Sequence, residues 1–220
     1  MLALCFTILS IPRVPTTTQP LQAVRLATDV DLPRIAQLQL DVFDPLPEAP
    51  PAASKPSLFA SLMGGGSSPE RIAKQRRERA ERLTTSLGDR MAQGSDLYIV
   101  EAEAEDGLVL VGSADLSEQE MMLPSHAIAE GLYLSSMAVD ASFRRRGIGR
   151  MLLRRAVERA EERGAECIWL HVEKANGAAL TLYQADGFAK QAETPRHAAF
   201  TSALELQQYE PMLFCKRLTQ

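Results

Sequence analysis

The chain has 220 residues, of which 45% are hydrophobic and 24% are charged, and its net charge is −4. This length is sufficient for one globular domain with a full hydrophobic core. The acidic balance excludes a domain-wide basic face, so we expect no general nucleic-acid binding, and any anion site must be local.

The first 21 residues are predicted to form a tail outside the domain. Residues 1–11 are apolar but too short to span a bilayer, and no Lys or Arg precedes them as in a signal peptide, so no membrane anchor is expected. Before Asp29 there are no acidic residues, whereas Arg13, Arg25 and six hydroxyl residues occur. Organelle transit peptides share this composition, although a disordered tail is equally consistent with it.

A strand and a helix open the predicted domain, which extends from about residue 22 to 218. Alternating apolar residues over 23–27 predict the strand, and a helix is expected over 32–42, with Asp31 as N-cap and Pro33 in the first turn. Residues 44–68 contain five prolines and three consecutive glycines, which predicts a long loop near a functional site.

An arginine-rich helix is expected over residues 69–87, with Ser68 as its N-cap and Gly88 as its terminator. Residues 70–82 hold six Lys or Arg against three Glu. Such a helix could receive an acidic partner, but a solvated helix face explains this kind of charge run more often.

The remaining elements predict a mixed, mostly antiparallel sheet of six to seven strands with helices on both faces, an α/β (α+β) fold. Residues 97–102 and 108–114 flank an Asp106-Gly107 turn, which indicates a β-hairpin. The later elements are a strand at 132–139, a helix at 148–163 ended by Gly164, a strand at 167–172, a helix at 177–185, a strand after Gly187 and a last strand at 210–216.

Three arginines occupy the turn before the helix at 148–163. Arg144, Arg145 and Arg146 lie where the helix dipole is already positive, so something negative is expected there. Gly147 and Gly149 let the backbone approach a ligand closely. Because the apolar positions of this helix recur every four residues, it should pack on the sheet with its N-terminus at the strand ends. A pyrophosphate is the natural ligand for such a turn.

This turn resembles the Arg/Gln-x-x-Gly-x-Gly/Ala signature of the GNAT superfamily of N-acetyltransferases, in which it grips the pyrophosphate of acetyl-CoA. Residues 176–188 also match the family pattern Asn-x-x-Ala-x-x-Leu-Tyr-x-x-x-Gly-Phe. The resemblance covers residues 132 to 189 and implies the GNAT fold and acetyl-CoA as co-substrate.

The resemblance also implies a set of site residues. The strand before the turn would pair with the pantetheine arm, the turn would hold the phosphates, and the start of the next helix would contact the cofactor. These positions are Met137, Ala138 and Val139, then Arg144, Arg145, Arg146, Gly147, Ile148, Gly149 and Arg150, then Asn176, Gly177, Ala178 and Ala179. Tyr183 would bind the cofactor and protonate the CoA thiolate as it leaves, although a core aromatic is the alternative.

An amine acceptor must also lose a proton before it attacks. Tyr133 and His171 lie on neighbouring predicted strands and could face the same gap where these strands separate. Imidazole suits proton transfer near neutral pH. The same pair occurs in a subset of protein N-terminal acetyltransferases that the chain resembles. Ordinary core packing is the alternative for both residues, and Glu130 and Glu173 are alternative bases.

The sequence therefore predicts an N-acetyltransferase that moves acetyl from acetyl-CoA to a primary amine by direct attack in a ternary complex. Protein N-terminal α-amines are the favoured acceptors and lysine side chains the second choice. A small amine is a further alternative, and a non-catalytic acyl-CoA-binding module is the alternative class. Resemblance to plastid acetyltransferases and the transit-like N-terminus favour the plastid, with the cytoplasm as the alternative. The oligomeric state is not indicated.

Cysteine usage points away from covalent or metal chemistry. Cys5, Cys167 and Cys215 are far apart, with no spacing suited to zinc and no dense disulfide framework, which fits a reducing compartment. Cys167 begins a predicted buried strand and has no obvious activator, so we expect it in the core rather than as a nucleophile. No metal site is predicted.

Overall fold

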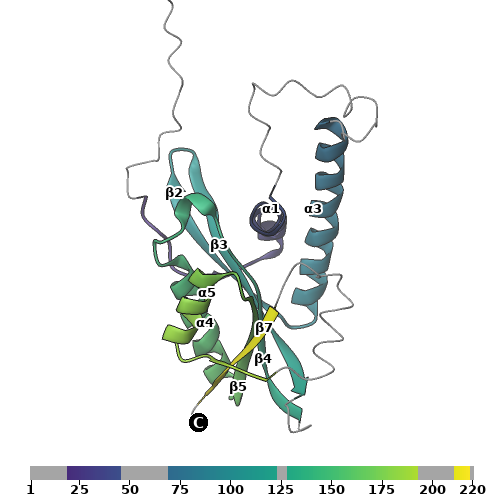
Figure 1. Ribbon diagram of the computed structural model, residues 1–220. Helices are drawn as coiled ribbons and strands as arrows, with labels where there is room; N and C mark the ends of the chain where they lie inside the picture. The colour runs from purple at the N-terminus through teal and green to yellow at the C-terminus, as the bar shows by residue number, and fades with distance from the viewer. Residues whose placement is uncertain (1–18, 46–68, 123–127, 193–210, 219–220) are drawn as a thin grey trace, which may run out of the picture.

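The computed structural model describes residues 19–45, 69–122, 128–192 and 211–218 (Figure 1). Cys5, Ser68 and all but the start of the predicted loop at 44–68 lie outside the described residues. No helix within the described ranges is long and apolar enough to cross a membrane.

One seven-stranded sheet forms the centre of the domain, with strand order β1-β2-β3-β4-β5-β7-β6. Among the strands of the described residues, only β4 and β5 pair in parallel, and α4 (Ile148–Glu162) connects them, because parallel strands need a crossover. The mixed, mostly antiparallel sheet predicted from the sequence is confirmed. The strands are β1 (Arg25–Leu26), β2 (Asp96–Ala104), β3 (Gly107–Met122), β4 (Ile128–Val139), β5 (Cys167–Glu173), β6 (Ala189–Lys190) and β7 (Pro211–Arg217).

Helices cover both faces of this sheet, as expected. Helices α1 (Leu32–Phe43) and α3 (Pro69–Ala92) lie on one face, and α4 and α5 (Gly177–Ala185) lie on the other (Figure 1). Two short 3-10 turns, η1 (Asp29–Asp31) and η2 (Ala141–Phe143), precede α1 and the arginine turn.

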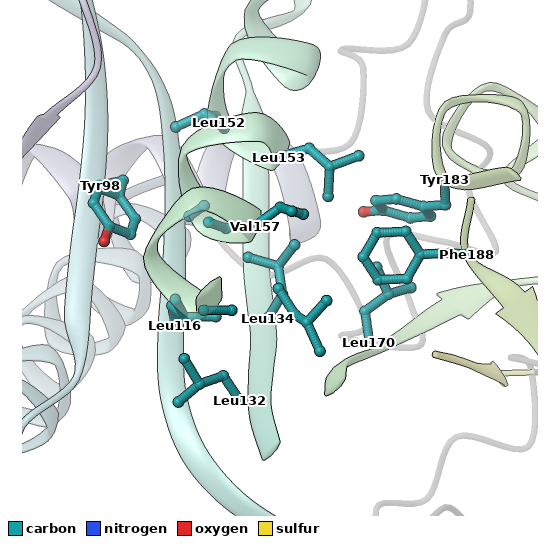
Figure 2. Close-up of a cluster of buried hydrophobic side chains, with 14 of the residues drawn as sticks. Tyr98, Leu116, Leu132, Leu134, Leu152, Leu153, Val157, Leu170, Tyr183 and Phe188 are labelled. Atoms are coloured by element: carbon teal, nitrogen blue, oxygen red, sulfur yellow. The ribbon is translucent and has the colours of Figure 1, made fainter. Parts of the chain in front are cut away.

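The largest hydrophobic cluster fills the space between α4, α5 and the sheet (Figure 2). The helix and sheet approach closely at Gly112 of β3, where an added Cβ would lie 2.5 Å from Ile148 Cγ2 and 3.2 Å from Leu152 Cδ1. Because Gly112 has no side chain, the first two turns of α4 press onto the sheet, and this contact fixes the N-terminus of α4 beside the end of β4.

The predicted end of the arginine-rich helix at Leu87 and Gly88 is wrong. Helix α3 continues through Gly88 to Ala92 and stops before Gly94, whose φ is +93°. A Cβ on Gly88 would lie 3.5 Å from Leu32 Cδ1 of α1. Gly88 therefore marks the close approach of two helices and does not terminate one.

Two arginines of α3 join it to α1. Arg76 and Arg79 form ion pairs with Asp41 and Asp44 at the end of α1. The exposed face of α3 carries five basic and four acidic residues, namely Arg71, Lys74, Arg77, Arg79 and Arg82 with Glu70, Glu78, Glu81 and Asp89. This balance favours the interpretation of a solvated face over a surface for an acidic partner.

Asp31 stands at the N-cap of α1, as predicted, but its carboxylate does not cap that helix. It accepts hydrogen bonds from Arg25 at 2.8 and 3.0 Å and from the Thr28 backbone N–H at 3.0 Å. The Arg25 guanidinium holds the pKa of this buried carboxyl well below its usual range. The Asp31 carboxylate therefore joins η1 to β1 and does not cap the N-terminus of α1.

The predicted hairpin is confirmed, with differences at its ends. The two-residue loop is Glu105–Asp106, and Gly107, whose φ is +119°, already pairs with Ala104. Strand β3 runs eight residues past the predicted end because it pairs with β4 as far as Met122. The segment assigned to the tail also makes sheet contacts, since Leu21 bridges Ala102 of β2.

Candidate functional site

A bulge interrupts β4 in the middle of the sheet. Asp115 of β3 pairs with Ser135, but Ser113 pairs with Ala138, so β4 has one residue more than β3 over this interval. Ser136 takes up the extra length with a left-handed φ of 51°. Because side chains alternate along a strand, this insertion brings Met137 onto the face that already carries Leu132 and Leu134.

Beyond the bulge, β4 and β5 no longer pair. Their ladder joins Leu132–Leu134 to Ile168–Leu170, although β5 continues to Glu173 and β4 to Val139. Within the described residues, no other strand pairs with that edge of β4. Its peptide groups can therefore receive an extended ligand as an added strand, and this is the edge where the resemblance placed the pantetheine arm, along Met137, Ala138 and Val139.

The arginine turn follows directly and ends in a left-handed residue. Arg145 has φ 65° and Gly147, the N-cap of α4, has φ 85°. A Cβ built on Gly147 meets no heavy atom within 4 Å, so space remains in front of the first turn of α4. Backbone N–H groups at a helix start together with open space suit a phosphate group.

The arginines of this turn differ in their partners. Arg146 donates to the Gln19 carbonyl and lies 4.9 Å from the Phe143 ring centroid, so its side chain is committed to the fold. Arg144 Nε donates to the Val139 carbonyl at 3.2 Å. Arg145 and Arg150 are exposed, and no acidic side chain of the described residues pairs with either. Arg145 and Arg150 are thus better placed to meet an anion than Arg146.

Gly149 and Asn176 have structural uses that the sequence did not indicate. A Cβ on Gly149 would lie 3.3 Å from Leu182 Cδ2, so Gly149 allows α5 to approach α4. Asn176 is the N-cap of α5, and its Oδ1 accepts from the Ala179 backbone N–H at 3.1 Å. The predicted ligand contact of Asn176 would therefore fall to its amide nitrogen, and Gly177, Ala178 and Ala179 form the exposed or half-buried first turn.

Tyr183 extends from α5 toward the part of β4 that lies beyond the bulge. Its hydroxyl donates to Met137 Sδ at 3.8 Å, and its ring centroid lies 5.9 Å from that of Phe188. Figure 2 shows the hydroxyl directed away from α5 and toward Leu153 of α4. Burial raises the pKa of Tyr183 to about 12, and the neighbouring Tyr133 adds a smaller rise. The phenol is therefore protonated near neutral pH.

Tyr133 and His171 meet where the β4–β5 ladder ends. The Tyr133 hydroxyl lies 2.6 Å from His171 Nδ1. Burial raises the pKa of Tyr133 to about 12, so we assign the hydroxyl as donor and Nδ1 as acceptor. The structure thus brings together the two residues that the sequence paired.

The other sequence candidates take different places. Glu173 ends β5 and is partly exposed, and the side chain of Glu130 lies outside the described part of the structure. Cys167 is 4% exposed and packs with Trp169, Leu213 and Cys215, as expected for a core residue. Among the described residues, no group of three or more His, Cys, Asp or Glu is placed to hold a metal ion.

Sequence reasoning missed the polar residues beneath the bulge. Asp115 is fully buried and forms an ion pair with Arg90 of α3. The signal was present in β3, where the polar residues Ser113, Asp115 and Ser117 alternate with apolar ones. That alternation marked a polar face in a strand that is covered on both sides.

Comparisons with known proteins agree with this geometry. A model of the acetyltransferase (GNAT) family matches residues 68–188, more than half of the chain. Over 55 residues, 25% of this chain and 37% of the relative, the sequence is 47% identical to a ribosomal protein bS18-alanine N-acetyltransferase of Salmonella typhimurium. Over 77 residues, 35% of this chain and 26% of the relative, it is 40% identical to a chloroplastic GCN5-related N-acetyltransferase of Arabidopsis thaliana.

A solved structure extends the similarity in fold to most of the chain. A Salmonella typhimurium protein solved with its cofactor acetyl-CoA superposes with a TM-score of 0.55 at 15% identity, covering 90% of this chain and 94% of that one. The curated relatives are matched over a smaller part, since the alignments span 37% and 26% of their lengths.

Proposed function

Because the chain belongs to the GNAT acetyltransferase family, we propose that it transfers the acetyl group of acetyl-CoA to the α-amine of a protein N-terminus. One observation carries this proposal. The hydrogen-bonded Tyr133–His171 pair lies where β4 parts from β5, and the buried Tyr183 phenol contacts Met137 farther along β4. Such a gap, with one group to accept a proton and another to donate a hydrogen bond, suits acyl transfer to an amine.

The residues at the end of β4 fit acetyl-CoA. The open space at Gly147, the N-terminus of α4 and the exposed Arg145 and Arg150 suit its pyrophosphate. The unpaired edge of β4 suits the amide groups of the pantetheine arm. When bound, acetyl-CoA supplies an activated acetyl group as a thioester, and the similar Salmonella structure was solved with it.

Tyr133 and His171 form a relay that removes the proton from the attacking amine. The Tyr133 oxygen accepts a proton from the ammonium, directly or through one water molecule, while its own hydroxyl proton passes to His171 Nδ1. The phenol stays neutral throughout, as its raised pKa favours, and the charge ends on the imidazolium. Freed of its proton, the amine has the lone pair that the attack requires.

Tyr183 acts at the other end of the reaction. Its hydroxyl is protonated, buried and held on the face of α4 and α5. A phenol there donates a hydrogen bond to the thiolate as it leaves, which stabilises negative charge where water is excluded.

The names of the relatives support a protein acceptor in this chain. One relative is a ribosomal-protein alanine N-acetyltransferase, and the other is a chloroplastic enzyme of the same family. Lysine side chains are the second acceptor class, and a small amine is the third. The chloroplastic relative and the hydroxyl-rich N-terminus support a plastid location, while the bacterial relative supports the cytoplasm.

The test is a mass-spectrometric acetylation assay with matched peptides. The full chain and acetyl-CoA are incubated with a peptide that has a free N-terminus and arginine in place of every lysine, and with its counterpart that has a blocked N-terminus and one lysine. Acetylation of the first peptide supports the proposal, and acetylation of the second alone reassigns the acceptor to lysine. Binding of CoA by calorimetry without turnover on any peptide or small amine would instead indicate a non-catalytic module.

A further inference from the structure

A polar hollow lies at the opposite end of α4 from the arginine turn. Its volume of about 440 Å³ falls within the range of roughly 300–1,000 Å³ that small-molecule sites occupy. Its walls come from Arg90 in the last turn of α3, from Ser117 and Glu118 of β3, and from Arg163, which follows α4. Because α4 has 15 residues, about 22 Å of helix separates this Arg90–Arg163 hollow from the arginine turn.

The strand register leaves room for this hollow. Strand β2 begins at Asp96, which pairs with Leu116 of β3, whereas β3 continues to Met122. Gly94, with a left-handed φ of 93°, leads the chain from α3 into β2, and no β2 residue pairs with Ser117. The hollow therefore occupies the place where a longer β2 would lie, and within the described residues the backbone of β3 has no strand partner on that side.

The charged side chains of the lining are two arginines and one glutamate, Glu118. Arg90 forms an ion pair with Asp115. Arg163 forms one with Asp96 at 2.9 Å. Neither of these aspartates lines the hollow, so they hold the two guanidinium groups at its wall without competing for a ligand there. The lining itself carries one positive charge more than its negative charge, which favours an anion.

The carboxylate of Glu118 is weakly held. Its side chain is 82% exposed and lies 3.3 Å from Arg163 Nη1. An exposed ion pair of this kind contributes little to stability, so another anion can replace Glu118 at Arg163 without leaving a buried charge unpaired. Glu118 thus marks a position at which an oxyanion meets the guanidinium group.

Uncharged donors complete the lining. Gln93, Ser95 and Ser117 line the hollow, and within the described ranges their side chains make no hydrogen bond. The buried Nε of Arg90 also has no partner there. Hydroxyl, amide and guanidinium groups on one wall suit a compact oxyanion, which accepts several hydrogen bonds at once.

The position of the arginines at helix ends does not by itself explain the hollow. Arginine is common near helix C-termini, because cations suit the negative end of the helix dipole. The carbonyls of Met91 in α3 and Glu161 in α4 already accept from the backbone N–H groups of Gly94 and Gly164. The guanidinium groups are not needed to cap these carbonyls and are available at the hollow.

We propose that the Arg90–Arg163 hollow binds a compact oxyanion, a carboxylate or phosphate group, with Arg163 as its main charge partner and the serine hydroxyls as further donors. This site goes beyond acetyl transfer, since none of its residues belongs to the cofactor edge. Ser117 pairs with Tyr133 of the proposed proton relay. The oxyanion can therefore belong to an acidic side chain of the acceptor or to a free small anion.

The test follows the backbone amides of Gly94 and Ser95 by NMR in the full chain, with excess CoA present to occupy the arginine turn. Inorganic phosphate, succinate and a peptide with a free N-terminus followed by glutamates are titrated at constant ionic strength. We expect saturable shifts of both amides with at least one of these probes and none with a glutamine counterpart of the peptide. Shifts with the glutamate peptide alone assign the oxyanion to the acceptor, whereas shifts with phosphate or succinate show that a free anion is sufficient.

Two neighbouring arginines separate ligand binding from a structural role. Arg159→Gln and Arg163→Gln each remove one of the two arginines that pair with Asp96, but of the two only Arg163 lines the hollow. We expect Arg163→Gln to weaken binding about tenfold, and Arg159→Gln to leave it within about twofold of the wild type. Glu118→Gln removes the competing carboxylate and should strengthen binding about two- to threefold.

Two results would overturn the proposal: no shift with any of the probes, or equal affinities of Arg163→Gln and the wild type. If Arg163→Gln fails to fold, Glu118→Gln decides the question, because its side chain is exposed and an unchanged affinity would then refute the site. The titrations involve no turnover. Wild-type protein that does not bind CoA would therefore overturn the proposed function and not this site.

Discussion

Replacing Tyr183 by Phe removes one hydroxyl group from the gap between β4 and α5. The hydroxyl is buried, and its recorded contact is the long one to Met137 Sδ at 3.8 Å. Because sulfur is a weak acceptor, its loss leaves no strongly polar atom unpaired, and we expect the free energy of unfolding to fall by less than about 1 kcal/mol. The ring keeps its contact with Phe188, so the fold and the CoA affinity should persist.

The effect on turnover follows from the pKa of Tyr183. Burial raises this pKa to about 12, whereas a thiol titrates near about 8.5. Complete proton transfer from this phenol to a thiolate would be unfavourable by roughly 3.5 pKa units, or about 4.8 kcal/mol. Tyr183 is therefore better suited to donate a hydrogen bond than to give up its proton. A hydrogen bond to a charged group contributes about 1.5–3 kcal/mol, so kcat should fall about 10- to 160-fold.

Release of CoA can be followed with a thiol-reactive dye at saturating acetyl-CoA, together with calorimetric CoA binding and thermal melting. The expected pattern is a reduced kcat with CoA affinity and melting temperature close to the wild type. A kcat within twofold of the wild type would refute the assignment of Tyr183 to the leaving group. A parallel loss of CoA affinity would make Tyr183 a binding or packing residue.

Three further predictions follow from the site and its supports. Asn176→Ala removes the cap of α5 and should lower the free energy of unfolding by about 1 kcal/mol in urea titrations, whereas Asn176→Ser should largely preserve it; equal stability of all three proteins would exclude the capping role. The contribution of Tyr133 and Tyr183 to stability should be constant up to about pH 10 and fall between about pH 10 and 12, because both phenols ionise near 12 when folded and near about 10 when unfolded. The loss is at most roughly 2.7 kcal/mol for each tyrosine, and urea midpoints that do not change from pH 9 to 12 would contradict it. Gly149→Val places a branched side chain against Leu182 and should lower stability by about 1–3 kcal/mol and reduce turnover by moving α5; an unchanged melting temperature would show that α5 does not depend on this contact.

Elements with a clear hydrophobic period and distinct ends could be predicted from the sequence almost to the residue. The helix α5 was predicted at its observed bounds, and α4 ends one residue before the predicted end, with Gly164 in a left-handed conformation as its stop. The end of α3 was mistaken because glycine has two structural uses. At Gly164 it provides a positive φ, whereas at Gly88 it makes room for Leu32, and the sequence does not distinguish the two.

The residues of the candidate site were chosen from the sequence, and the structure shows which of them lie together. Tyr133 and His171 were correctly expected to face the same gap between strands, because they lie on β4 and β5, which are adjacent and parallel. The partners of Arg146 and Asn176 could not be predicted, since one depends on Gln19, far away in the sequence, and the other on helix geometry. The sequence does carry a sign of the bulge, because the large apolar residues change from even to odd positions, 132 and 134 and then 137 and 139.

The inserted residue changes which positions of β4 face each side of the sheet. Before the bulge, Tyr133 lies on the face of α3, together with Trp169 and in the same alternation as Asp115, whose partner is Arg90 of α3. After the bulge, Met137 lies on the face of α4 and α5 and contacts Tyr183.

The proposed proton acceptor and the proposed hydrogen-bond donor to the thiolate therefore lie on opposite faces of the sheet, beside the place where β4 and β5 stop pairing. The proposed roles therefore have the amine enter from the side of α1 and α3 and the thiolate leave toward α4 and α5. Direct transfer through the gap requires no covalent relay, which agrees with the burial of Cys167 away from the cofactor edge.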